Sequence, residues 1–432
     1  MTVRVAFEAS DLYPDKGGLY TYASRLLQHL GELDDAPVLT LLDGQGYSSM
    51  QSLRDANGAA LPVGRFVGTK AWPVLHRSQG PWQKDYRTRR LAYAIDSKTL
   101  MPLWRRADSI PFLTRWRFPR DFARNQDLCH WPFEGVFTPL QGVAHVATVH
   151  DTIVLRYPQW LNNPTYVADH THKLRAMARY ASRIIADSEH TRRDVVDLLA
   201  IALERIDVVP LAAGPEFCPP ANLSDVTDTL ARYGLQRDRY IFFVGILSER
   251  KNVVRLATAF KAAVDRAPEL TMRLVLAGKR GWMADAIYQA LEELGLGERL
   301  VLPGRVAQED LPRLLAGARA VAYVSLYEGF GLPALEAMAC GTPVVASNTT
   351  SIPEVVGDAG LLVDPYDVAA IAEALHRLMT DDALRAELAA QGLRRAAHFS
   401  WQRTAALTMD TYRRALACAR PAGNVADNRS RR

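Results

Sequence analysis

Short apolar runs alternate with segments of helical periodicity along most of this chain. Runs rich in Val, Ile, Leu and Phe are typical of buried strands, and apolar positions repeated every three or four residues are typical of amphipathic helices. The alternation predicts an α/β fold, in which helices connect the strands of parallel sheets. The expected strands are Val3–Ala9, Val38–Leu42, Asp127–His130, Ala144–Thr152, Arg183–Ala186, Ile206–Val209, Tyr240–Val244, Arg273–Ala277, Leu300–Leu302, Ala320–Ser325, Pro343–Ala346 and Leu361–Val363. Helices are expected over Tyr22–Leu30, Pro164–Tyr180, Thr191–Leu199, Met283–Leu294, Val368–Ala397 and Ser400–Ala419, and from Val253 and Pro333 onward.

A segment dense in proline and glycine, Pro210–Pro220, separates the two halves of this pattern. Such a composition favours turns and predicts an interdomain linker. A chain of 432 residues also exceeds what one ordinary hydrophobic core organises. We therefore expect an N-terminal domain over 1–212 and a C-terminal domain over 213–400. The tail, 420–432, has too few apolar residues to pack and is expected to be disordered.

The composition is that of a soluble globular protein, with 48% hydrophobic and 23% charged residues. No apolar run approaches the roughly 20 residues that span a bilayer. The first strand begins at Val3, without the layout of a signal peptide. The four cysteines are scattered without a CxxC pair, which favours free thiols in a reducing compartment.

Positive charge is concentrated in one irregular segment, 43–125. The whole chain has a net charge of +5, but the part from Lys70 to Arg124 carries about +9 together with four tryptophans. Basic residues interleaved with tryptophan suit an anionic membrane surface or an acidic, lipid-linked substrate. Nucleic acid is a weaker alternative, since no nucleic-acid module is recognisable, and a solvated insertion is another. Within this segment we expect helices near Arg89–Ile95 and Phe112–Phe122.

The clearest chemical signal is the stretch Tyr327–Glu336, where a strand passes through glycines into a short helix. Pro333 suits the first helical position, where no N–H is needed. The amides just before it would point out of the helix N-terminus and favour an anion. Those amides belong to Phe330, Gly331 and Leu332. Glu328 at the mouth and Glu336 one turn into the helix would accept hydroxyl groups. The pattern predicts a ligand with phosphate and hydroxyl groups; a plain strand–helix turn with two solvated glutamates is the alternative.

Polar groups also follow strands of the first half, at the edge where ligands of open α/β sheets bind. Gly17 and Gly18 follow the first strand and would let backbone approach a phosphate or a sugar. His150 ends a later strand and can bond a sugar hydroxyl or hold charge near a leaving group. A tight turn explains the glycines equally well, and a satisfied loop histidine is the alternative for His150.

In the second half, Gly245 ends a strand, and Arg250 and Lys251 lie just before the next helix. A guanidinium binds a diphosphate bidentately and an ammonium binds it as a point charge. A solvated basic pair is the alternative. The turn that contains Val306 offers backbone groups that could read a nucleobase edge. Groups from both halves together predict a cleft that holds a nucleotide sugar.

The order of these motifs resembles glycosyltransferase family four, whose members have the GT-B fold. The likeness is carried by Thr148-Val149-His150-Asp151, Ala186-Asp187-Ser188-Glu189, Gly245 with Arg250-Lys251-Asn252, the E-x7-E stretch from Glu328 to Glu336, and Ser351-Ile352-Pro353-Glu354-Val355. It is loose over Val3–Leu42 and close over Asp127–Trp401, and no family pattern is found over 43–125. The resemblance implies two Rossmann-like domains with parallel sheets facing across a cleft. It also implies a last helix, 401–419, that crosses back to the N-terminal domain.

The resemblance also implies roles for individual residues. Glu328 would contact the hydroxyls of the donor sugar, with His150 beside it, and these two are the expected catalytic residues. Glu336 would bind the ribose, and Arg250 and Lys251 would bind the diphosphate. The rest of the expected donor site is Gly17, Gly18, Gly245, Val306, Phe330, Gly331 and Leu332. No metal and no other cofactor is expected, and the chain contains no D-x-D motif.

Finally, the resemblance implies transfer of a hexose from a nucleotide sugar to a saccharide, with retention of anomeric configuration. The run Leu155-Arg156-Tyr157-Pro158 is similar to mannosyltransferases that build bacterial surface polysaccharides, which favours GDP-mannose as donor. A lipid-linked saccharide acceptor would fit the basic segment with its tryptophans. Such an enzyme would be cytoplasmic, with peripheral contact at the inner face of the membrane and no nucleic-acid partner. A nucleotide-sugar epimerase of the same fold and a non-catalytic sugar-binding scaffold are the alternatives.

Overall fold

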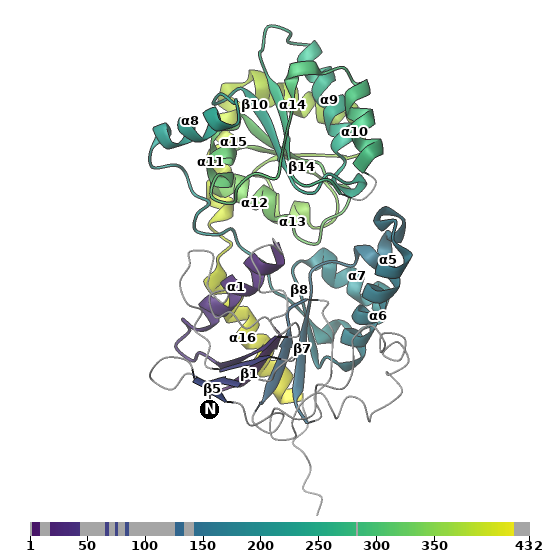
Figure 1. Cartoon of the computed structure of the whole chain (residues 1–432), viewed down its shortest axis with the longest axis vertical. Coiled ribbons are helices and arrows are strands. Elements are labelled where there is room, and N and C mark those ends of the chain that lie inside the picture. The colour runs from purple at the N-terminus through teal and green to yellow at the C-terminus, as the bar shows by residue number, and fades with distance from the viewer. Residues whose placement is uncertain are drawn as a thin grey trace, which may run out of the picture.

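The computed structural model describes residues 2–8, 18–43, 65–68, 74–76, 83–85, 126–133, 142–281 and 284–418. These residues form two lobes, each built around one sheet (Figure 1). We call the nine-stranded sheet and its helices the N-terminal domain, and the six-stranded sheet and its helices the C-terminal domain. The predictions for Gly17, for helices near 89–95 and 112–122, and for the tail 420–432 fall outside the described residues.

The N-terminal sheet has the strand order β5-β4-β3-β2-β1-β6-β7-β8-β9. Its strands are β1 (Arg4–Glu8), β2 (Val38–Asp43), β3 (Arg65–Gly68), β4 (Val74–His76), β5 (Gln83–Asp85), β6 (Leu128–Trp131), β7 (Ala144–Val149), β8 (Arg183–Ala186) and β9 (Ile206–Val208). In this spatial order, all neighbouring strands from β3 to β9 pair in parallel, as expected. The two pairs at the other edge, β3–β4 and β4–β5, are antiparallel. Sequence reasoning missed β3, β4 and β5, because the pattern over 43–125 is irregular.

Alternate residues of the central strands face two layers of helices. The helices of this domain are α1 (Gly18–Leu30), α5 (Ile153–Arg156), α6 (Pro164–Tyr180), α7 (Glu189–Leu199) and α16 (Trp401–Cys418). Along β7, Val146 belongs to the core shared with α1 and α16, whereas Ala147 and Val149 belong to the core shared with α6 and α7. This period of two is what a strand buried on both faces requires.

A buried histidine joins the last helix to the N-terminal sheet. His130 Nδ1 lies 2.7 Å from the Tyr412 hydroxyl of α16, and its Nε2 lies 2.9 Å from the Thr148 hydroxyl of β7. Burial, helped by the charge of nearby His150, lowers the pKa of His130 to about 3, so the ring is neutral. The chain thus leaves the C-terminal domain and ends its described part against the N-terminal sheet, as the yellow helix in Figure 1 shows.

The C-terminal sheet has the order β12-β11-β10-β13-β14-β15, and all its pairs are parallel. Its strands are β10 (Tyr240–Val244), β11 (Arg273–Ala277), β12 (Leu300–Gly304), β13 (Ala320–Tyr323), β14 (Val344–Ser347) and β15 (Leu361–Val363). Its helices are α8 (Leu223–Arg232), α9 (Val253–Asp265), α10 (Ala284–Glu293), α11 (Leu311–Gly317), α12 (Leu332–Ala339), α13 (Ile352–Val356), α14 (Val368–Thr380) and α15 (Asp382–Ala396). The expected α/β class is confirmed, although α8, α11 and α13 were not foreseen.

The segment expected to be a linker, Pro210–Pro220, runs between the two sheets without helix or strand. It is not loosely attached, because Phe217 within it is buried in the core. Among the described residues, every helix is too short or too polar to cross a bilayer.

Candidate active site

The residues with the E-x7-E spacing lie between β13 and α12. Gly331, just before the helix, has a φ of 114°, a left-handed conformation that favours glycine. Pro333 is the second helical residue rather than the first, but it still lies in the turn where no N–H is needed. No side chain among the described residues caps this helix end.

Glu328 lies between two cations. Its Oε2 accepts a hydrogen bond from Arg250 Nη1 at 2.7 Å, and its Oε1 accepts one from Lys251 Nζ at 2.6 Å. Lys251 Nζ also donates to the Tyr323 hydroxyl at 2.6 Å. Burial alone would raise the pKa of Glu328, but Arg250 and Lys251 outweigh it and lower the pKa to about 2. The carboxylate is therefore ionised in the unliganded protein.

This cluster couples roles that the sequence assigned to separate parts of a donor. Glu328 was expected at the sugar, and Arg250 and Lys251 at the diphosphate, but the three side chains bind one another. A diphosphate placed on the two cations would share them with Glu328 or displace its carboxylate. Because opposite charges in a buried site interact strongly, that exchange changes the position of Glu328. A diphosphate bound there would therefore change the orientation of Glu328.

His150 follows the end of β7, and its ring is held within the N-terminal domain. Nδ1 lies 2.6 Å from Asp187 Oδ2, and Nε2 lies 2.8 Å from the carbonyl oxygen of Pro132. A carbonyl oxygen accepts hydrogen bonds but cannot donate them, so Nε2 carries a proton. The ring of Tyr22 packs edge-on against His150, with 4.6 Å between centroids. The ring is thus fixed at the sheet edge, with Nε2 donating to a carbonyl oxygen and Nδ1 hydrogen-bonded to Asp187.

The backbone of His150 contacts the loop that carries Glu328. A Cβ added to Gly329 would lie 1.8 Å from the carbonyl oxygen of His150 and 2.8 Å from Asp151 Cβ. The carbonyl oxygen of Gly329 in turn accepts hydrogen bonds from the hydroxyls of Ser188 at 2.7 Å and Thr191 at 3.1 Å. The two expected catalytic residues therefore lie on facing loops, and Gly329 is small because the two backbones nearly touch.

The remaining residues expected to bind the donor have surroundings that differ from one residue to the next. Phe330 is buried edge-on against Phe399, so its main chain rather than its ring is left for a ligand. Gly245 meets the neighbouring loop: a Cβ added to Gly278 would lie 1.7 Å from the Gly245 carbonyl oxygen. That contact requires a glycine at 278, whereas Gly245 itself has a φ of 152°, a conformation that side chains other than glycine rarely adopt. Gly18 is the first residue of α1, with open space where a Cβ would lie. Leu332 and Val306 are partly buried and pack against the core.

Glu336 lies in α12 without direct contact to the cluster around Glu328. Burial and the nearby carboxylate of Glu216 raise its pKa from 4.5 to about 8. Glu216 belongs to the segment that connects the domains and accepts a 2.6 Å hydrogen bond from Arg25 Nη2, a side chain that is 1% exposed. Arg25 therefore neutralises Glu216 directly, while Glu336 holds its own proton near neutral pH.

The raised pKa of Glu336 predicts a loss of stability as pH rises. The folded value of about 8 exceeds the ordinary 4.5, so the stabilisation is fully present below pH 4.5 and is lost as pH rises through 8. Replacing Glu336 with glutamine should reduce the fall in melting temperature between about pH 5 and pH 8.5. Melting curves across that range test this, with Glu373→Gln at an exposed site of α14 as the control. An unchanged slope in Glu336→Gln would contradict the assignment.

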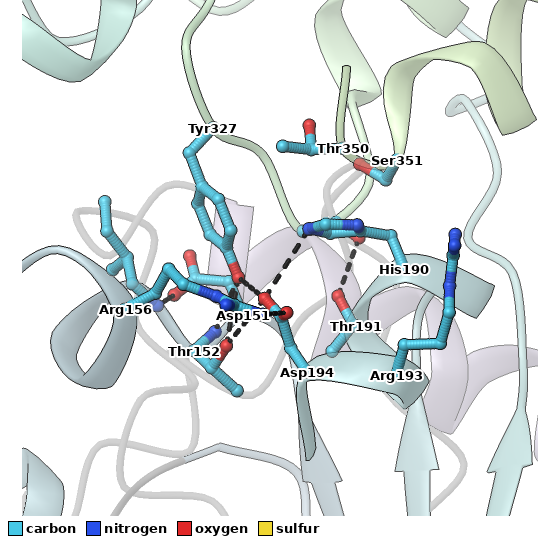
Figure 2. Close-up of polar contacts among 12 residues, drawn as sticks. Asp151, Thr152, Arg156, His190, Thr191, Arg193, Asp194, Tyr327, Thr350 and Ser351 are labelled. Atoms are coloured by element: carbon cyan, nitrogen blue, oxygen red, sulfur yellow. Dashed lines mark hydrogen bonds and ion pairs between the residues drawn. The ribbon is translucent and has the colours of Figure 1, made fainter. Parts of the chain in front are cut away.

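A second polar cluster, centred on Asp194 of α7, was missed by sequence reasoning. Asp194 Oδ2 accepts hydrogen bonds from the Tyr327 hydroxyl at 2.7 Å and the Thr152 hydroxyl at 3.1 Å, and Oδ1 accepts one from Arg156. Figure 2 shows Tyr327 pointing from the loop of the C-terminal domain into this cluster. One signal was present in the sequence: Thr191 and Asp194 are three residues apart, which places two polar groups on one helix face.

No group of three or more His, Cys, Asp or Glu side chains suited to a metal ion occurs among the described residues.

Three comparisons place this arrangement among known proteins. A family model described as Glycosyl transferases group 1 matches residues 228–395. The chain is 35% identical over 270 residues to O-antigen chain mannosyltransferase B of Escherichia coli, covering 62% of this chain and 70% of that protein. It is 32% identical over 277 residues to serotype-specific mannosyltransferase WbdA of Escherichia coli. That alignment covers 63% of this chain and 33% of WbdA, so the chain spans about a third of that relative.

Solved structures share the fold along nearly the whole chain. Sucrose-phosphate synthase from Thermosynechococcus elongatus superposes with a TM-score of 0.67 at 21% identity, covering 96% of this chain and 99% of that one. Anabaena HepE in complex with UDP-glucose superposes with a TM-score of 0.65 at 18% identity, covering 95% and 99%. The fold is the two-domain GT-B fold of glycosyltransferases, as expected. The chain belongs to the group 1 glycosyltransferases.

Proposed function

We propose that the protein transfers a mannosyl group from GDP-mannose to a saccharide acceptor of a bacterial surface polysaccharide, with retention of anomeric configuration. The observation that carries the proposal is the cluster of Glu328 with Arg250 and Lys251, on a loop that faces His150 from the other domain. The names of two relatives, O-antigen chain mannosyltransferase B and the mannosyltransferase WbdA, support mannose as the sugar and surface polysaccharide as the product.

The cluster suits the charge that develops in this reaction. Cleavage of the bond between the anomeric carbon and the phosphate oxygen leaves negative charge on the departing diphosphate. Arg250 and Lys251 are fixed in place before the reaction, so they stabilise this charge more in the transition state than in the ground state. Losing one such group typically costs about 3 kcal/mol of barrier. No metal ion is needed in this scheme, because the two cations serve the leaving group.

Retention follows if the acceptor attacks from the face that the diphosphate leaves. In that scheme the departing phosphate oxygen takes the proton of the acceptor hydroxyl, and no covalent intermediate forms on the protein. Glu328, once displaced from the cations, would accept hydroxyls of the donor sugar, and His150 would lie beside that sugar. Glu336 would bind the ribose. In this scheme the loop before α12 binds the sugar of the donor, and the helix α12 binds its ribose.

We further propose a lipid-linked acceptor and peripheral contact with an anionic membrane. The support is the net charge of about +9 and the four tryptophans between Lys70 and Arg124, a composition that suits a surface of anionic lipid.

Nucleotide binding tests the donor. We expect GDP and GDP-mannose to raise the melting temperature more than UDP and UDP-glucose do, since a ligand at 100 times its dissociation constant adds about 2.7 kcal/mol of stability. A larger shift with the uridine compounds would contradict GDP-mannose, and no shift with any nucleotide would contradict the donor site.

Product analysis separates the alternatives. Incubation with GDP-mannose and a mannose-containing oligosaccharide should give an extended saccharide and GDP, with the anomeric configuration of the donor seen by NMR. A new nucleotide sugar formed without acceptor would indicate an epimerase. Tight binding of the nucleotide sugar without turnover would indicate a sugar-binding scaffold.

A further inference from the structure

The N-terminus of α7 is capped by a carboxylate from the other domain. The amide groups of Glu189 and His190 donate to Glu354 Oε2 and Oε1, each at 2.7 Å. Within its own domain, the Ser188 hydroxyl accepts from the Thr191 amide at 3.0 Å. Amides at a helix N-terminus attract negative charge, so Glu354 is electrostatically matched to this end of α7. Glu354 lies in α13, which belongs to the C-terminal domain.

A second contact across the domains joins Asp194 to the loop of Glu328. The Tyr327 hydroxyl donates to Asp194, whose side chain is 2% exposed, and the carbonyl oxygen of Tyr327 accepts from Arg250 Nη1 at 3.1 Å. Burial alone would raise the pKa of Asp194, but hydrogen bonds from Arg156 and Tyr327 outweigh it and lower the pKa. Tyr327, the residue before Glu328, thus connects an ionised carboxylate of α7 to the loop of Glu328.

The same loop is braced from within its own domain. The Ser351 hydroxyl lies 2.9 Å from the carbonyl oxygen of Glu328 and 2.8 Å from that of Phe330. Ser351 is the residue before α13, the helix that carries Glu354. Ser351 therefore links the helix that carries the cap of α7 to the loop of Glu328, and Figure 2 shows Ser351 and Thr350 above the α7 residues.

We propose that Asp194 and Glu354 are positioning residues for glycosyl transfer: they hold the loop of Glu328 in register against the end of β7 in the N-terminal domain. The donor site would then face the acceptor side in one fixed arrangement when the domains are closed. Neither residue is expected to touch the donor. The role in catalysis rests on the glycosyl transfer proposed above, whereas the role in holding the two domains together does not.

Contacts within the N-terminal domain would remain after either contact across the domains is removed. Without Tyr327, Asp194 keeps its bonds to Arg156 and Thr152, both from its own domain. Without Glu354, the helix α7 keeps its local cap from Ser188. Removing both contacts should therefore weaken the docking of the lobes, where the Ser188 and Thr191 hydroxyls still bind the Gly329 carbonyl oxygen, and leave each lobe folded.

Small-angle X-ray scattering of the full ligand-free chain tests the structural claim. The Glu354→Gln/Tyr327→Phe double variant should have a larger radius of gyration than the wild type, whose scattering should fit the closed arrangement. Glu373→Gln, which alters an exposed ion pair with Arg266 far from this interface in sequence, should scatter like the wild type. A double variant with wild-type scattering, or a wild type that is already open, would overturn the proposal.

Kinetics test the positioning role. Glu354→Gln and Asp194→Asn should each lower kcat by about 10–100-fold, since small misplacement of reacting groups costs that much. The dissociation constant of GDP should change by less than about twofold, because the proposed nucleotide site lies in one domain. As a control, Asp265→Asn at an exposed site of α9 should leave kcat and GDP binding unchanged.

A double-mutant cycle separates positioning from general damage. If Asp194 acts through Tyr327, Asp194→Asn should have little further effect on kcat in the Tyr327→Phe background. Fully additive effects, or a parallel loss of GDP binding, would refute the role. Should Asp194→Asn fail to fold, Tyr327→Phe alone still tests the contact from the other domain. If wild-type protein does not use GDP-mannose, the donor proposal fails while the scattering result still decides the contact.

Discussion

Gly329→Ala is expected to abolish glycosyl transfer while leaving nucleotide binding intact. The new Cβ would lie 1.8 Å from the carbonyl oxygen of His150 and 2.8 Å from Asp151 Cβ, far inside van der Waals contact. Both neighbours directly follow β7, a strand buried on both faces, which limits how far their backbone can shift. The φ of Gly329 lies outside the left-handed region, so alanine does not strain the loop itself. The domains must therefore separate to accommodate the methyl group.

The measurements are kcat with GDP-mannose and a saccharide acceptor, GDP affinity by calorimetry, and scattering by the full chain. We expect kcat to fall by about 100-fold or more, with GDP affinity changed by less than about twofold and a larger radius of gyration. Gly392→Ala in α15 is the control, because its Cβ would approach the Met338 side chain no closer than 3.3 Å. Normal turnover by Gly329→Ala would show that the closed contact is not part of the reaction.

Much of the fold could be predicted because buried parallel strands are continuous apolar runs. The bounds of β8, β10, β11 and β15 agree with those expected from the sequence alone. Two of the helices that were not foreseen, α11 and α13, span 7 and 5 residues, too few for a helical period to be recognised. The strands β3, β4 and β5 were not predicted because the segment 43–125 has no regular pattern.

The candidate site was predicted as a set of residues, but its contacts were not. The rule that ligands bind at the carboxyl ends of strands brought Lys251 and Glu328 to one edge of the sheet. Their 2.6 Å contact spans 77 residues and depends on β10 lying beside β13, a strand order that no local pattern encodes. The contact of Asp194 with Tyr327 spans 133 residues and depends on how two domains dock. Local sequence patterns cannot predict contacts between residues so far apart in the chain.

Glu328→Gln is expected to destabilise the unliganded protein and to slow transfer, yet to spare or improve GDP binding. Arg250 and Lys251 would remain buried and charged without an ionised partner, and breaking a buried ion pair costs about 3–5 kcal/mol. A diphosphate supplies the missing negative charge without competing against a carboxylate. GDP should therefore raise the melting temperature of Glu328→Gln by more than it raises that of the wild type.

The pH dependence of this difference has a definite sign. Glu328 has a pKa of about 2 in the folded protein, below its ordinary 4.5, so its stabilisation is present above 4.5 and is lost as pH falls through 2. The gap in stability between wild type and Glu328→Gln should persist from about pH 7 to pH 5 and shrink below that. Glu373→Gln, at an exposed pair, should change stability by less than about 1 kcal/mol.

Turnover completes the test of Glu328. If its carboxylate accepts sugar hydroxyls after leaving the two cations, Glu328→Gln should lower kcat by about 100-fold or more, because an interaction made in the transition state is lost. GDP affinity should stay equal or rise, because the competing charge has gone. Weaker GDP binding with unchanged kcat would mean that Glu328 serves to hold Arg250 and Lys251 for the diphosphate, and that another group contacts the sugar.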